Sequence, residues 1–99
     1  MKVERFGEYI RRLRGENGLP LRKVAAQLDI DTSTLSKVER GERALIKEHL
    51  KPLSKILNIE LKEIQVRFIA DTINKELGQL EFVKEGLKEA EKQIKKEKK

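Results

Sequence analysis

The strongest constraint on the fold is a pair of short amphipathic segments with very little chain between them. Residues 21–28 place apolar side chains three and four residues apart, and residues 32–40 place Leu35 and Val38 three apart, which is the spacing of one face of an α-helix. Only Asp29-Ile30-Asp31 separates them, and the Asp31 carboxylate is placed to cap the second helix by accepting N–H groups of its first turn. Two short helices joined by so tight a turn have helix-turn-helix spacing.

Further helices are expected on both sides of this pair. A helical face over residues 6–17 precedes it, and Gly18 is the expected stop of that helix. After the pair, Gly41 is expected to end the second helix, residues 48–57 carry a fourth helix, and a fifth begins near Glu60. The pattern predicts an all-α chain.

The apolar pattern continues into the C-terminal part of the chain with a repeat close to 3.5 residues. Gly78 divides this seam into two helices, and a seam of this kind requires a partner helix. Three interpretations are open: packing on its own domain, a dimer interface, or binding of another protein. We favour the dimer, because the repeat extends far beyond what a five-helix domain needs. The residues expected at the interface are Ile69, Ile73, Leu77, Leu80, Val83 and Leu87.

The composition argues against several functions. The chain of 99 residues has no Cys, which removes disulfides, thiolate zinc sites and a Cys nucleophile. His49 is the only histidine, and no metal-ligand set, nucleophile–base pair or phosphate-binding glycine loop accompanies it. No apolar run approaches the ~20 residues that cross a bilayer, and no signal peptide is expected. We therefore expect a cytoplasmic protein that is not an enzyme and has no cofactor or metal.

The kind of positive charge is more informative than its amount. The net charge of +6 arises from 23 Lys and Arg against 17 Asp and Glu and is spread thinly along the chain. Every arginine except Arg67, however, lies in residues 1–43, whereas lysines dominate the C-terminal end. The planar guanidinium suits phosphates and guanine edges, and the lysine ammonium solvates helix faces. If this division of Arg and Lys is not accidental, the residues that recognise a binding partner lie in the N-terminal half.

The second helix of the pair carries small hydrogen-bonding side chains on its exposed face. In a helix-turn-helix unit this helix lies in the major groove of DNA and reads base edges, and Lys37 can reach O6 and N7 of a guanine. The alternative is that the Thr-Ser-Thr run merely caps a surface helix, which leaves the flanking Arg40 and Arg43 unexplained. The residues expected to read bases are Thr32, Ser33, Ser36 and Lys37.

A known family shares this pattern. The segment of residues 18–43 reads GLPLRKVAAQLDIDTSTLSKVERGER and resembles the helix-turn-helix signature of the lambda-repressor-like (Cro/C1, XRE) DNA-binding family. The similarity extends from about Phe6 to Ile64. The resemblance implies a five-helix DNA-binding domain, assigned here to residues 1–68, that binds double-stranded operator DNA as a homodimer. Residues 69–99 then form a C-terminal helical dimerisation extension.

The resemblance also implies roles for individual residues. Arg14 and Glu39 match a buried or half-buried ion pair that joins the first helix to the third, so we interpret Glu39 as structural. Three positions depart from the family pattern. Pro20-Leu21 stands where a Gln usually binds a phosphate, so Arg22 is expected to replace it; Asp29 stands for the turn Gly, and Leu45 for a Pro. The residues expected to contact phosphates are Arg22, Thr34, Arg40 and Arg43.

The functional expectation is a bacterial or phage-encoded transcriptional regulator, most simply a nucleoid-associated repressor. No small-molecule effector is expected, because so short a chain leaves little room for an effector domain. One alternative is an antitoxin-like or adaptor protein whose C-terminal helices bind another protein. Another is an RNA- or ribosome-associated adaptor. The sequence specifies neither the operator, nor the regulated gene, nor the sign of regulation.

Overall fold

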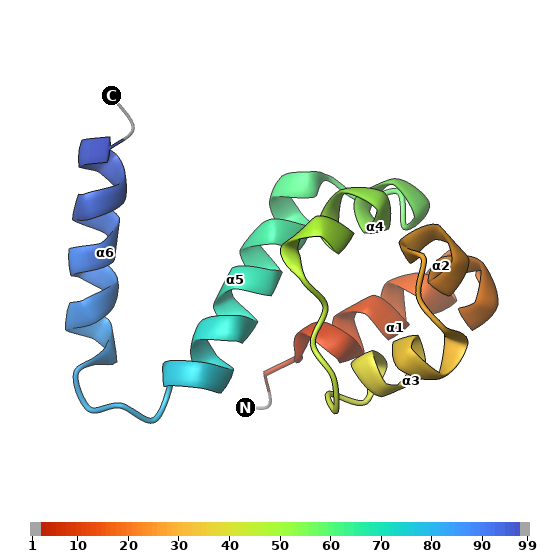
Figure 1. The fold of residues 1–99 in the computed structure, drawn as a ribbon, viewed down its shortest axis with the longest axis horizontal. Coiled ribbons are helices and arrows are strands. Elements are labelled where there is room, and N and C mark those ends of the chain that lie inside the picture. Colours follow the sequence, from red (N-terminus) through yellow and green to blue (C-terminus); the bar gives the residue numbers. More distant parts are fainter. Residues whose placement is uncertain (1–2, 98–99) are drawn as a thin grey trace.

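The computed structural model describes residues 3–97, and within them it contains helices and no strands (Figure 1). The all-α prediction is therefore confirmed. In chain order the elements are α1 (Phe6–Glu16), α2 (Leu21–Leu28), α3 (Thr32–Glu39), the short 3-10 helix η1 (Lys47–His49), α4 (Leu50–Ile56), α5 (Leu61–Leu77) and α6 (Val83–Glu97).

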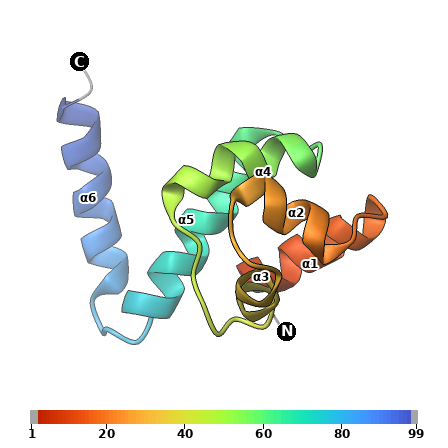
Figure 2. The same cartoon turned by 45° about the vertical axis from the view of Figure 1, so that its right-hand side comes forward.

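Helices α1 to α5 form one body, and α6 stands away from it. The close helix pairs are α2 with α3, α1 with α3, α2 with α4, α4 with α5 and α1 with α5; α6 belongs to none of them. Figures 1 and 2 show α5 leading out of the body and the chain turning back through a loop into α6. The helix α5 is continuous across residue 68, and Gly78 caps its C-terminal end as predicted.

The five helices of the body share one core. Each contributes one side chain with no exposed surface, and burial of each such side chain stabilises the fold by about 1.5–3 kcal/mol. These residues are Ile10, Val24, Leu35, Leu53 and Ile64. Leu45, in the loop between α3 and η1, is also buried, so this loop is held against the core by the residue that replaces the family's proline.

The turn between α2 and α3 forms without the family's glycine. Asp29 itself adopts the left-handed conformation, with φ 58° and ψ 43°. The N–H of Ile30 then donates to the Ala25 carbonyl at 3.0 Å, which closes the end of α2. Gly18 and Gly41 also have positive φ, of 63° and 79°, at the ends of α1 and α3 where helix stops were predicted.

Three local predictions require correction. Asp31 is the N-cap residue of α3, but its exposed carboxylate makes no capping hydrogen bond. The expected helix over residues 48–57 is instead η1 followed by α4, with Pro52 in the first turn of α4 where its missing N–H is tolerated. The helix predicted over residues 32–40 ends at Glu39, and Arg40 is its C-cap.

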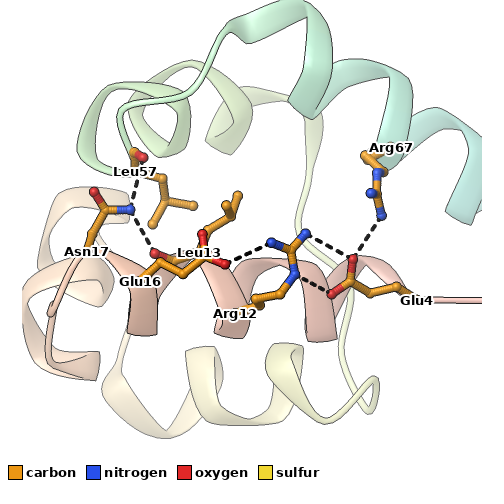
Figure 3. Close-up of polar contacts among 7 residues, drawn as sticks. All are labelled: Glu4, Arg12, Leu13, Glu16, Asn17, Leu57 and Arg67. Atoms are coloured by element: carbon orange, nitrogen blue, oxygen red, sulfur yellow. Dashed lines mark hydrogen bonds and ion pairs between the residues drawn. The ribbon is translucent and has the colours of Figure 1, made fainter.

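A polar cluster on the outer side of α1 holds the N-terminal segment and α5 (Figure 3). The Arg12 guanidinium donates to Glu4 at 2.8 Å and to Glu16 at 3.0 Å. Arg67 of α5 donates to the other Glu4 oxygen at 3.2 Å, and its guanidinium lies 4.3 Å from the centre of the Tyr9 ring. The hydrogen bonds from Arg12 and Arg67 lower the pKa of Glu4, whereas burial raises the pKa of Tyr9.

Asn17 connects the end of α1 to the end of α4. Its side-chain Nδ2 donates to the Leu13 carbonyl at 2.7 Å and to the Leu57 carbonyl at 3.2 Å (Figure 3). One amide group therefore bonds to a carbonyl at the C-terminal end of each helix, and the Leu13 carbonyl also accepts the backbone N–H of Asn17 at 3.0 Å.

Gly7 allows α1 and α3 to approach closely. A methyl group at this position would collide with the carbonyl oxygen of Val38 and lie 2.8 Å from that of Glu39. Both obstacles are backbone atoms at the end of α3, so the side chain of any other residue would push α3 away from α1.

We expect Gly7→Ala to destabilise the protein by about 1–3 kcal/mol, because the new methyl group overpacks the α1–α3 contact. The measurement is urea unfolding followed by circular dichroism. Gly15→Ala is the matched control, because Gly15 lies in the same helix and a methyl group added there would meet nothing within 4 Å. This control should be neutral or stabilising by up to about 1 kcal/mol. Equal unfolding free energies for the two variants would contradict the proposed contact.

Candidate nucleic-acid interface

The side chains predicted to read bases all belong to α3. Leu35 and Val38 of this helix are buried in the core, which turns the opposite face of α3 outward. The side chains of Thr32, Ser33 and Lys37 are exposed, and Ser36 is half-buried. The structure therefore places donors and acceptors on the outer face of a helix that is anchored from behind.

Two of the predicted contact residues are bonded to each other. Arg40 Nη1 donates to Ser36 Oγ at 2.7 Å. The same guanidinium donates through Nε to Glu42 Oε2 at 3.0 Å and through Nη2 to Glu42 Oε1 at 3.4 Å. The hydrogen bonds between Arg40 and Glu42 raise the pKa of Arg40 and, together with the nearby charge of Lys37, lower the pKa of Glu42. Residue type alone did not single out Glu42, although its position between Arg40 and Arg43 is visible in the sequence.

The other residues predicted to contact phosphates lie around α3. Arg22 is exposed in the first turn of α2, Thr34 is half-buried in the first turn of α3, and Arg43 is exposed in the loop that follows α3. Neither the Arg22 nor the Arg43 side chain forms a hydrogen bond or an ion pair within residues 3–97. Both guanidinium groups are thus available to an anion from outside the chain.

The Arg14 and Glu39 side chains form a two-point ion pair that fastens α3 to α1. Arg14 Nε donates to Glu39 Oε2 at 2.7 Å, and Nη2 donates to Oε1 at 3.0 Å. Arg14 Nη1 also donates to the Leu19 carbonyl at 2.9 Å, just before α2 begins. The hydrogen bond to Glu39 raises the pKa of Arg14, and the Glu39 side chain is only 5% exposed. Glu39 lies behind α3, away from its outer face.

The predicted interface residues of the C-terminal part lie along α5, the following loop and α6. Two connected hollows, of about 360 and 550 Å³, separate α5 from α6 and share Ile73 and Leu87 as lining residues. No side chain of α6 is buried. Among the predicted residues, those that are exposed are Ile69, Leu77, Leu80 and Leu87, and those that are half-buried are Ile73 and Val83.

Metal-ligand groups and membrane-spanning helices are both absent from residues 3–97. Within residues 3–97, no three His, Cys, Asp or Glu side chains are grouped to hold a metal ion. His49 Nδ1 instead accepts the Ile46 N–H at 3.2 Å, which closes the first turn of η1. None of the described helices has the length and apolar character needed to span a membrane.

Comparison with known proteins identifies a family. A family model described as helix-turn-helix matches residues 10–64, from the middle of α1 into the first turn of α5. This range contains α2, α3 and the loop with Glu42 and Arg43. No curated protein matches the chain.

We expect Glu39→Gln to destabilise the protein by about 3 kcal/mol, because it leaves the Arg14 guanidinium without its counter-charge. This is the lower end of the usual cost for a buried pair, since the Arg14 side chain is 17% exposed. Urea unfolding measures the loss. The matched control is Glu42→Gln, which breaks an exposed Arg–Glu pair and should leave the unfolding midpoint unchanged. Coincident unfolding curves for the two variants would show that the Arg14–Glu39 pair does not hold α3.

Proposed function

The chain belongs to the Cro/C1-type (XRE) family of helix-turn-helix DNA-binding proteins, and from that premise we propose that it is a transcriptional repressor that binds a pseudo-palindromic operator as a homodimer. The observation that carries the proposal is the exposed polar face of α3, held from behind by the core and by the Arg14–Glu39 pair. The rigid support matters because hydrogen bonds to base edges discriminate only when the donors are held in register.

In this proposal α3 lies in the major groove and reads the operator. Lys37 donates to O6 and N7 of a guanine, and the hydroxyl groups of Thr32, Ser33 and Ser36 bond to neighbouring base edges. Thr32 and Ser33 begin the helix, and Lys37 lies one turn further on. Because of these different positions along α3, the side chains contact different base pairs.

Phosphate contacts set the orientation of the domain on the duplex. Arg22 lies in the first turn of α2, and Arg43 lies in the loop after α3. In our proposal, their unpaired guanidinium groups bind the phosphates that flank the groove. Arg40 and Thr34 complete this set in our proposal. Because phosphate contacts release counterions, binding weakens steeply as salt rises.

We assign DNA binding to residues 1–68 and dimerisation to residues 69–99. Two protomers must place their α3 helices about 34 Å apart to enter successive major grooves. The exposed apolar side chains of α5 and α6, including Ile69 and Leu87, supply a surface that a second copy would cover. The repressor would act in the cytoplasm of a bacterium, on its nucleoid, and would respond to its own concentration rather than to a small molecule.

A second candidate function rests on the same apolar surface. If α6 binds a different protein, the chain is an antitoxin-like or adaptor protein. Sedimentation of the isolated chain separates the two candidates, because a self-complementary seam gives a discrete dimer and an unfilled seam gives a monomer or aggregates.

The experiment that tests the proposed function is selection of bound sites from random duplexes with the full chain. A repressor dimer should recover a motif with two-fold symmetry and half-sites one or more helical turns apart. Recovery of an asymmetric motif, or of none, would overturn the proposal of a pseudo-palindromic operator. Competition with RNA in the same assay tests the RNA-associated alternative.

We expect Lys37→Ala to weaken binding to the selected duplex by about 1–3 kcal/mol and to relax the preference at one base step, because it removes a bidentate base contact. Titration of labelled duplex at fixed salt gives the affinity. Lys62→Ala removes the same charge from an exposed position on α5 and serves as control. If Lys37→Ala binds as the wild type does, α3 does not read the operator in this way.

We expect Ile69→Lys to convert a dimer into a monomer, because a charge in the seam cannot be buried without a partner. Sedimentation equilibrium measures the change as a halving of mass. Ile46→Lys is the matched control, since Ile46 is exposed to nearly the same extent (56% against 54%) in the loop before η1. A dimer that survives Ile69→Lys would exclude this face as the interface.

A further inference from the structure

An acidic side chain lies within the surface that we propose to face DNA. Glu42 is exposed and is the residue that pairs with Arg40. Lys37, one turn before Arg40, contributes to the lowered pKa of the Glu42 carboxyl. We propose that both Lys37 and Arg40 contact DNA. A carboxylate close to them weakens their attraction to the phosphate backbone.

The backbone fixes the point from which the Glu42 side chain begins. Gly41 takes φ 79°, and the N–H of Glu42 donates to the Lys37 carbonyl at 2.8 Å. The Gly41 N–H also donates to the Val38 carbonyl at 3.0 Å, so the chain turns back sharply against the end of α3. Glu42 is therefore part of the helix stop itself, and its side chain starts from a defined point beside Arg40.

The pair also has the geometry that Arg40 would use on DNA. Two guanidinium nitrogens face two carboxylate oxygens at 3.0 and 3.4 Å, which is the fork arrangement by which arginine binds a phosphate. The third nitrogen, Nη1, donates to Ser36 Oγ. Ser36 Oγ accepts this hydrogen bond through one of its lone pairs. Its hydroxyl hydrogen can therefore still donate to a base acceptor.

We propose that Glu42 is a positioning residue that acts through Arg40: it occupies the guanidinium in the free protein and holds it against Ser36, so that DNA must displace the carboxylate to bind Arg40. In a loose, sequence-independent complex, no phosphate is close enough to displace the carboxylate, so Arg40 adds little attraction. On the operator, the register of α3 brings a phosphate to Arg40, and the exchange of carboxylate for phosphate takes place. The inference rests on the proposed function, because it requires α3 to bind DNA.

The test compares Glu42→Gln with the wild type on two probes, the duplex selected from random sequences and a scrambled duplex of the same length. Glu42→Gln should tighten binding to the selected duplex by roughly three- to tenfold, because Arg40 no longer has to leave a carboxylate to reach its phosphate. Binding to the scrambled duplex should tighten by less, so the specificity ratio rises.

Two controls separate this role from a general effect of charge. Glu16→Gln makes the same charge change in another exposed Arg–Glu pair, with Arg12 on α1, and should leave the specificity ratio unchanged. In an Arg40→Gln background, Glu42→Gln should have no effect on the ratio beyond that of Glu16→Gln, because the residue through which Glu42 acts is gone.

The outcomes distinguish the two proposals. If the wild type selects an operator and Glu42→Gln leaves the ratio unchanged or lowers it, the inference about Glu42 fails and the proposed function stands. The same holds if the effect persists without Arg40. If the wild type binds no duplex, the proposed function fails and the inference fails with it.

Discussion

The placement of α3 depends on the contact between its C-terminal end and α1. Glu39 accepts two hydrogen bonds from Arg14 there, and Gly7 lets the two backbones approach until no methyl group would fit between them. Arg14 also bonds to the Leu19 carbonyl, so one guanidinium fixes α1, the entry to α2 and α3 together. The outer face of α3 carries hydroxyl groups and the flexible Lys37 side chain, and it acquires a defined geometry from this contact behind it.

Periodicity and turn residues were sufficient to predict most of the fold. The bounds of α2 follow from its apolar spacing, and its ends agree with Pro20 before it and Asp29 after it. Gly7, Tyr9 and Leu45 are buried without having been predicted so. Two of them are covered by elements distant in the chain: Gly7 lies beneath α3, and the Tyr9 ring beneath Arg67 of α5. Apolar spacing marks the face that the core covers, but it does not show where an element distant in the chain covers a second face.

The candidate interface was predictable as a set of residues and not as a set of bonds. Residue type and helix position identify Ser36 and Arg40, but the structure adds that they are bonded to each other and that Glu42 holds Arg40 on its other side. Within residues 3–97, Arg22 and Arg43 are instead the predicted phosphate-binding arginines that stay unpaired. A sum of charges therefore overestimates what this surface offers to DNA, since the cations that are already paired must exchange one anion for another.

The stability of the C-terminal helix α6 is not explained by contacts within its own chain. A helix of 15 residues is marginally stable in water by itself, and α6 buries no side chain of its own. Its apolar stripe, which includes Leu87 and Ile94, still follows the spacing of a helix that is covered along one side. α6 is in none of the close helix pairs of its own chain, so in the proposed dimer burial on the second copy would stabilise it. Folding of α6 would then be coupled to association, and the geometry that separates two α3 helices would exist only in the assembled dimer.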